Sequence, residues 1–198
     1  MSNEIKNNPK QLSSARAFRQ SLRETESNES HLRLYLEFGQ QLFMQGWNVN
    51  TASSLLHSLC NLVSAQQAVL AIENMGKLVI YTQIGQTLPV GARIPMMGIL
   101  AQMLKNPVQF ALYENKNTQL WTHLDPLHHE CLVPIAIGQH AKGVIGLSGK
   151  KLTLSHVEKD SLNAVAGIIA LAISQHQGIA RNESDQSILE TLDRKSVV

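Results

Sequence analysis

Short runs of apolar residues separated by polar turns fill the middle of the chain, and this pattern predicts a β-sheet. Residues 131–149 form two apolar runs around a Gly-containing turn, which is typical of a hairpin. A similar pair of runs at 67–72 and 77–84 predicts a second hairpin. The runs within 131–149 are apolar at odd and even positions alike, so both faces of the sheet should be covered. Pro134 lies inside the first of these runs, and since proline cannot donate to a strand ladder, it requires an edge or a bulge.

Two helices are predicted ahead of the sheet, because apolar residues recur there at helical spacing. The first covers about 32–43 and ends near Gly46, a residue type that favours helix termination. Residues 48–51 (Asn-Val-Asn-Thr) then cap a second helix, whose apolar residues continue along one side to Val63.

Helices are also predicted within and after the strands. Apolar residues over 96–104 predict a short helix that 106–107 (Asn-Pro) closes, and 108–112 is a candidate strand. Ser155 with Glu158 three residues later is a capping box. It precedes an apolar stripe at helical spacing, formed by Leu162, Val165, Ala166, Ile169 and Ile173.

The order of these elements resembles that of the GAF domain family. The resemblance rests on the apolar strand with Val133 and Pro134, the polar turn, the sequence GVIGL after it, and the long Ala/Ile-rich helix with an acidic start. Leu154 stands where that family usually has Phe, and Glu158 where it often has Asp. The resemblance extends back to about His31. It implies a GAF/PAS-like α/β (α+β) fold, in which helices cover both faces of a central antiparallel sheet.

One domain with two tails is the expected organisation of the 198 residues. Residues 1–30 are polar and bury too little apolar surface to offset the entropy of ordering, so they are predicted to form a flexible tail. Gly178 is predicted to end the last helix, and the sparse apolar residues of 178–198 predict a C-terminal tail. The GAF-like domain accordingly spans 31–177.

Composition and charge exclude several classes of function. A formal net charge of +2 offers no electrostatic basis for nucleic-acid binding. Every apolar stretch falls short of the ~20 residues that a membrane span needs, and the N-terminus lacks the apolar core of a secretory signal. Cys60 and Cys131 lie in apolar contexts, which is typical of reduced, buried thiols in a cytoplasmic protein. We therefore expect a cytoplasmic protein that holds no cofactor.

Residues 121–131 are the most chemically varied segment of the chain, since they include one tryptophan, three histidines, two acids and a cysteine. Their spacing matches no metal-ligand signature, and the adjacent His128 and His129 cannot both point inward from a regular strand, so no metal is expected. In GAF folds this segment borders the pocket, which makes Trp121, His123 and His128 candidates for stacking on or hydrogen bonding a planar ligand. A surface loop with incidental histidines is the alternative, which the sequence leaves open.

Arg93 is the best single candidate for binding an anionic group. It is the only arginine between Arg33 and Arg181, in a link expected near the pocket mouth, and it suits a phosphate or a carboxylate. A surface arginine is the alternative. Met96 and Met97 would form either an adaptable lid or ordinary core. The expected site lies between the sheet and the segments 93–103 and 110–129, with the candidate residues Arg93, Met96, Met97, Phe110, Trp121, His123, His128 and Cys131.

The resemblance implies a sensory or regulatory domain that binds a small ligand, with a nucleotide as one candidate, and that signals to a separate partner protein. A ligand-free module for protein–protein interaction or dimerisation is the alternative. A free methionine sulfoxide reductase of the GAF type is a third hypothesis, but that branch has its pocket cysteines upstream of the strand, whereas Cys131 lies inside it. No catalytic motif is present, so we expect no enzyme.

A homodimer is expected through the helices at 32–43 and 162–173. Small residues such as Ala164, Gly167 and Ala170 surround much of the second helix beside its apolar stripe, and they permit close approach of another helix. The alternative is that both helices simply cover the sheet within one subunit.

Overall fold

The computed structural model describes residue 29 and residues 32–85, 89–109, 112–114, 131–149 and 152–195, with side chains as far as Gly178. Its contacts divide the chain into two units, Met1–Glu37 and Phe38–Val198, and each is described by itself. In the first unit, residues 32–37 are helical, as the sequence predicts. The predicted tail 1–30 lies outside the described residues apart from Glu29. All further description concerns the second unit.

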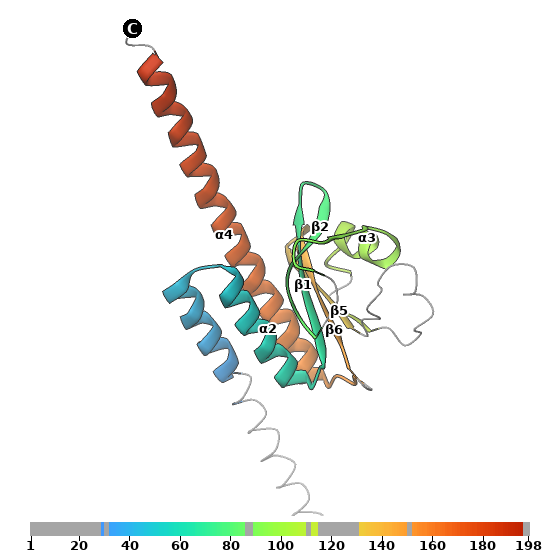
Figure 1. The fold of residues 1–198 in the computed structure, drawn as a ribbon. Coiled ribbons are helices and arrows are strands. Elements are labelled where there is room, and N and C mark those ends of the chain that lie inside the picture. Colours follow the sequence, from blue (N-terminus) through green and yellow to red (C-terminus); the bar gives the residue numbers. More distant parts are fainter. Residues whose placement is uncertain are drawn as a thin grey trace, which may run out of the picture. The chain divides into compact units, whose positions relative to one another are not determined.

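Within the described residues, a six-stranded sheet forms the centre of this unit (Figure 1). All neighbouring strands pair antiparallel, in the order β3-β2-β1-β6-β5-β4. The pairs β1–β2 and β5–β6 are the two hairpins that the sequence predicts. The strands are β1 (Gln67–Asn74), β2 (Lys77–Ile84), β3 (Arg93–Ile94), β4 (Tyr113–Glu114), β5 (Cys131–Ile137) and β6 (His140–Ser148).

The β1–β2 hairpin closes through a two-residue turn. Met75 and Gly76 both have positive φ, at 51° and 75°, a combination whose twist matches that of the flanking strands. The Gly76 N–H donates to the Glu73 carboxylate at 2.6 Å, which ties the turn together. The prediction of a hairpin at this point is therefore confirmed.

Pro134 lies at a sheet edge, as the sequence requires. The outermost strand, β4, pairs only with Cys131 and Leu132 of β5. Beyond Leu132, the outer side of β5 has no strand beside it among the described residues, so the missing proline N–H breaks no ladder there.

Helices cover both faces of the sheet (Figure 1), which confirms the predicted fold class. On one face lie α2 (Val49–Val63) and α4 (His156–Lys195), and α4 packs mainly against β5. On the other face, α3 (Gly98–Lys105) buries Leu100 and Met103 against the sheet. The sheet residues in this second cluster are Ala71, Leu78, Leu132 and Val144.

The capping box at the start of α4 is present as predicted. Ser155 Oγ lies 2.7 Å from a carboxylate oxygen of Glu158, and the Glu158 N–H donates back to Ser155 Oγ at 3.3 Å. The Ser155 N–H also donates to that carboxylate at 2.7 Å. These bonds satisfy backbone donors that the first turn of the helix would otherwise leave without partners.

The predicted break at Gly178 is absent, because α4 continues through it to Lys195 and is 40 residues long. A glycine costs a helix interior roughly 1 kcal/mol relative to alanine, which weakens a helix without ending it. Termination requires a residue whose backbone leaves the helical region, and Gly178 is not among the described glycines with positive φ.

Two predicted boundaries around α3 are wrong. Met96 and Met97 precede the helix, which begins at Gly98, because Met97 has the extended backbone of a cap residue. Residues 107–109 form a turn after the predicted closure at Asn106, and the strand comes later, at Tyr113–Glu114. Short apolar runs do not specify where pairing with a neighbouring strand begins.

Candidate functional site

Trp47 lies in a short link between the helix over 38–45 and α2. Gly46, with a φ of 68°, ends the first helix, and its N–H donates back into that helix at 2.9 Å. The Asn48 side chain accepts from the Thr51 N–H at 3.0 Å and so caps α2, as predicted. The Thr51 hydroxyl donates to the Gly46 carbonyl at 3.1 Å. Hydrogen bonds on both sides therefore fix the position of Trp47.

The Trp47 indole stacks on Tyr81 of β2. The ring centroids are 5.6 Å apart and the ring planes differ by 11°. Only 8% of Trp47 is exposed, so the pair forms part of the packing between the helices and the sheet. Burial raises the pKa of the Tyr81 phenol, which is therefore a neutral hydrogen-bonding group at physiological pH.

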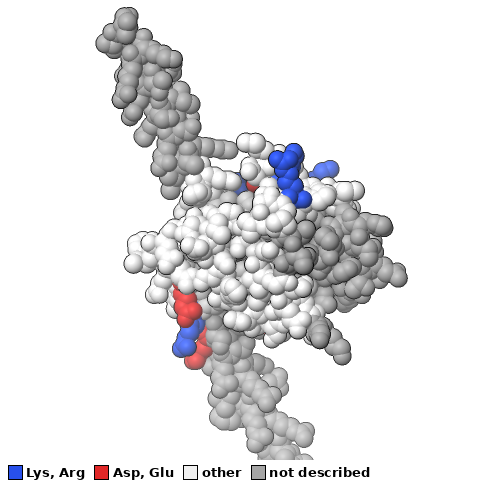
Figure 2. Space-filling view, viewed as in Figure 1, with Lys and Arg blue, Asp and Glu red and all other residues white. Residues whose placement is uncertain are grey.

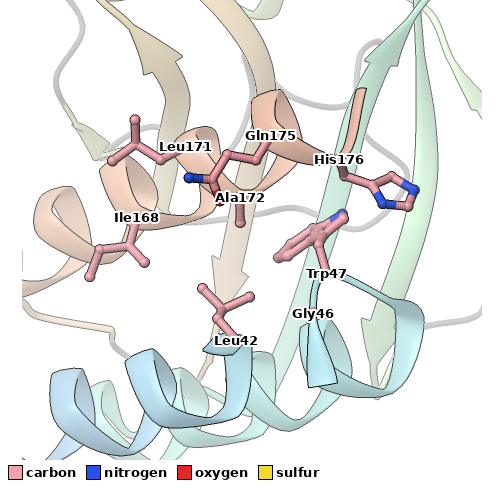
Figure 3. Close-up of a pocket in the computed structure, with 8 residues that line it drawn as sticks. All are labelled: Leu42, Gly46, Trp47, Ile168, Leu171, Ala172, Gln175 and His176. Carbon is pink, nitrogen blue, oxygen red and sulfur yellow. The ribbon is translucent and has the colours of Figure 1, made fainter. Parts of the chain in front are cut away.

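Two hollows meet at Trp47 and His176, which line both of them. The first, the helix hollow, lies between the helix over 38–45 and α4 and has a volume of about 300 Å³ (Figure 3). Residues of α4 form one of its sides and Leu42 and Trp47 the other. Its lining consists of Leu42, Gly46, Trp47, Ile168, Leu171, Ala172, Gln175 and His176.

The second, the hairpin hollow, has a volume of about 280 Å³ and lies where α4 passes the β1–β2 hairpin. Its lining combines two aromatic rings, three aliphatic side chains and several polar groups. These residues are Trp47, Ile72, Glu73, Asn74, Val79, Tyr81, Ile173, His176 and Gln177. A small number of polar groups on an apolar lining is typical of sites for small molecules.

A third hollow, the α3 hollow, lies on the opposite face of the sheet and has a volume of about 670 Å³. It separates α3 from the turns of both hairpins. Its lining is more polar and is formed by Glu73, Met96, Ala101, Leu104, Lys105, Gln139, His140, Ala141 and Lys142.

Arg93 does not lie on the α3 side, where we expected it. It pairs with Val79, and because paired residues of neighbouring strands share a face, both side chains stand on the face that α2 and α4 cover. Val79 lines the hairpin hollow. Arg93 is exposed and forms no ion pair with a described residue. The expected arginine therefore stands beside a different cavity.

The methionines take separate positions. Met96 is half-buried, packs against the α3 cluster and lines the α3 hollow. Met97 is 56% exposed and lines none of the three hollows. Four other expected residues lie outside the described part of the chain, namely Phe110, Trp121, His123 and His128.

Cys131 points away from the α3 side. Leu132 belongs to the α3 cluster, and successive strand residues alternate between faces, so Cys131 faces α4. Its neighbours there include Glu114, which forms a 2.8 Å ion pair with Lys159 of α4. Burial, with a smaller contribution from the Glu114 charge, raises the pKa of the Cys131 thiol to about 12. Cys131 is thus a neutral thiol with 1% exposure and cannot line a site beside α3.

Cys60 is also buried, on α2, and burial raises the pKa of its thiol. Within the described ranges, no group of three or more His, Cys, Asp or Glu residues could hold a metal ion. In the same ranges, no helix combines the length and hydropathy that crossing a membrane requires.

Sequence reasoning missed the residues at the centre of the two adjoining hollows: Trp47, Tyr81, His176 and Gln177. The aromatic residue between Gly46 and Asn48 was a usable signal, since a tryptophan in so short a link must pack against a neighbouring element. No local pattern marks the others, because they meet Trp47 only through the fold.

Comparisons with known proteins agree with this architecture. No family model and no curated protein matches the sequence. Among solved structures, the GAF domain of a phosphoenolpyruvate-protein phosphotransferase from Coxiella burnetii is similar, with 16% identity and a TM-score of 0.61. The match covers 77% of this chain and 98% of that one.

Two further structures are similar in fold. A methyl-accepting chemotaxis protein (residues 122 to 287) matches with 13% identity and a TM-score of 0.53, over 64% of this chain and 88% of that one. The free methionine-R-sulfoxide reductase from Neisseria meningitidis, in complex with its substrate, matches with 12% identity and a TM-score of 0.59. That match covers 75% of this chain and 91% of the reductase chain. The chain therefore forms a GAF-like domain, a conclusion that rests on structure alone.

Proposed function

We propose that this GAF-like domain is a sensory or regulatory module that binds a small ligand next to α4 and transmits its presence along that helix to a separate partner protein. The observation that carries the proposal is the course of α4. It packs on the sheet, lines both hollows at Trp47, and continues as one helix to Lys195.

A continuous helix suits this role because it is stiff. At 1.5 Å per residue, 40 residues span about 60 Å, so a small change of tilt at the hollows displaces the far end by several ångströms. The similar folds of a phosphotransferase GAF domain and a chemotaxis protein support a regulatory role.

Native mass spectrometry of the purified protein, looking for a retained small molecule, is the direct test. A thermal-shift screen with nucleotides, cyclic dinucleotides and organic acids would follow. We expect a ligand that stabilises the protein and also slows hydrogen exchange in α4. A protein that retains nothing and responds to no compound would overturn the ligand-sensing proposal.

A ligand-free interaction or dimerisation module is the second candidate function. The observation that favours it is a set of exposed apolar side chains on the two helices that border the helix hollow. Phe43 is 89% exposed, Met44 78% and Leu171 56%. Exposed apolar side chains grouped on neighbouring helices are typical of protein interfaces. A partner or second copy that binds without any small molecule would distinguish this function from ligand sensing.

We further propose that the protein is not a redox enzyme, despite its similarity in fold to a reductase. Thiol chemistry requires an accessible thiolate with a second thiol nearby. Both cysteines are buried, and the raised pKa of Cys131 keeps its thiol protonated at neutral pH.

A further inference from the structure

The hairpin hollow has a lining that suits a small flat molecule. Its lining includes the stacked pair Trp47 and Tyr81 and the apolar side chains of Ile72, Val79 and Ile173. A volume of about 280 Å³ is at the lower end of the range for ligand pockets, so the molecule would be small.

Three cations lie near this hollow, although none of them belongs to its lining. Lys77 pairs with Asn74 and Arg93 pairs with Val79, so both cations stand on the same face as these two lining residues. Lys142 of β6 lines the α3 hollow, but its Nζ donates at 3.3 Å to the side-chain oxygen of Gln177, a residue of the hairpin hollow. Figure 2 shows most of the blue side chains at the upper part of the described surface, where red is also visible, while most of that surface carries no charge.

Negative charge does not balance these cations. Between residues 38 and 178, the described acids are Glu73, Glu114, Glu158 and Asp160. The last two lie in the first turns of α4, and Glu114 is paired with Lys159. Only Glu73 borders the hollow, and its carboxylate is occupied by the Gly76 N–H of the hairpin turn. Three cations therefore lie near a hollow whose lining holds one acid, and that carboxylate is hydrogen-bonded to the hairpin turn.

Hydrogen-bond donors also line the hollow. Since Gln177 uses its side-chain oxygen to accept from Lys142, its amide N–H groups remain available to a ligand. The side chains of Asn74 and His176 add further donors, and neither side chain is hydrogen-bonded to a described residue. Donors beside an excess of positive charge are the chemistry that recognises a carboxylate.

We propose that the hairpin hollow binds a small aromatic carboxylate, with its ring against the Trp47–Tyr81 pair and its anionic group toward Gln177, His176 and the nearby cations. This inference rests on the proposed ligand-sensing function and names its site and ligand class. Ile173, His176 and Gln177 all belong to α4, so the bound molecule would contact the helix that we propose transmits the signal.

Calorimetry with benzoate and 4-hydroxybenzoate as probes tests the proposal, with the neutral amide benzamide as the matched ligand control. We expect the carboxylates to bind and benzamide to bind at least about tenfold more weakly. Affinity should fall as salt is raised, because Lys77 and Arg93 are solvent-exposed. Quenching of Trp47 fluorescence in a Trp121→Phe background would place the probe at the aromatic pair.

The variants Arg93→Gln and Lys77→Gln remove exposed charges without disturbing the core, and together they should weaken carboxylate binding by about tenfold. Lys105→Gln is the matched control, since it removes the same charge on the opposite face and should change affinity less than about twofold. The site would be overturned if Lys105→Gln weakened carboxylate binding as much as Arg93→Gln with Lys77→Gln, or if neither carboxylate bound. The sensing proposal would survive that outcome if another compound class stabilised the protein and slowed exchange in α4.

Discussion

At the scale of single residues, burial determines what the chemically reactive side chains can do. Cys131, the first residue of β5, faces α4 with 1% of its surface exposed, and its thiol is held in the neutral form. The same residue at the surface would be a candidate nucleophile. In this fold it behaves as a small apolar side chain that helps to pack α4 on the sheet.

The raised pKa of Cys131 predicts a loss of stability in alkali. Its value is 9.0 for an unperturbed thiol and about 12 in the fold, so below pH 9 the thiol is neutral in both states and contributes no pH dependence. Above pH 9 the unfolded chain releases the proton and the folded chain does not, and stability should fall by about 2 to 3 kcal/mol by pH 11. Denaturant unfolding of the wild type and Cys131→Ala across this range measures the effect. Cys60→Ala, which retains Cys131, should keep most of the slope.

The same burial predicts that the protein does not reduce free methionine sulfoxide. With a thiol reductant supplied, we expect no turnover above the uncatalysed rate, because no thiolate is accessible at neutral pH. The assay compares the wild type with Cys131→Ser. Turnover that disappears in the variant would show that the fold is catalytic after all.

At the scale of elements, a short hydrogen-bonded link positions the two helices that it joins. The link from Gly46 to Asn48 sets the angle between two helices and thereby brings Trp47 onto Tyr81. The hollows on either side of Trp47 depend on this arrangement.

Removing the cap tests how far this link matters. Asn48→Ala should destabilise the protein by about 1 kcal/mol, because a backbone N–H at the start of α2 loses its acceptor. Asn50→Ala is the matched control, since Asn50 is exposed in the first turn of the same helix and alanine favours helix there. Denaturant melts give both values, and the tryptophan fluorescence of Asn48→Ala reports whether Trp47 moves. Equal effects of the two substitutions would contradict the cap as the cause.

At the scale of the whole molecule, α4 links the sheet, the hollows at Trp47 and the C-terminal region. Its exposed Leu171, with Phe43 on the neighbouring helix, also makes this side a candidate contact surface. Ligand sensing and association would therefore use the same helix, which is compatible with a ligand that changes how two copies pack.

We predict a homodimer through these helices. Light scattering at micromolar concentration should give about twice the chain mass of 21.9 kDa. Combining Phe43→Ser with Leu171→Ser should shift the protein to monomer, because both exposed apolar side chains lose their contribution to the interface. Val108→Ser, an exposed site in the turn after α3, should leave the mass unchanged. A monomer mass for the wild type at all concentrations would exclude the dimer.

Local signals in the sequence were sufficient to predict most elements. The hairpin turn at Gly76, the cap at Asn48 and the capping box of Ser155 and Glu158 each act within a few residues, so their physics is visible in the sequence itself. The apolar runs of β5 and β6 likewise predicted a sheet covered on both faces, because such runs leave no polar side for water.

Only the tertiary structure decided which chemistry meets at the candidate site. Arg93 was a sound candidate for binding an anion, but strand register places it beside the hairpin hollow and away from α3. Trp47, Tyr81 and His176 come from three separate elements, and their meeting depends on long-range packing that no local pattern encodes. Side-chain type determines what a residue can bind, whereas register and packing determine which residues share a cavity.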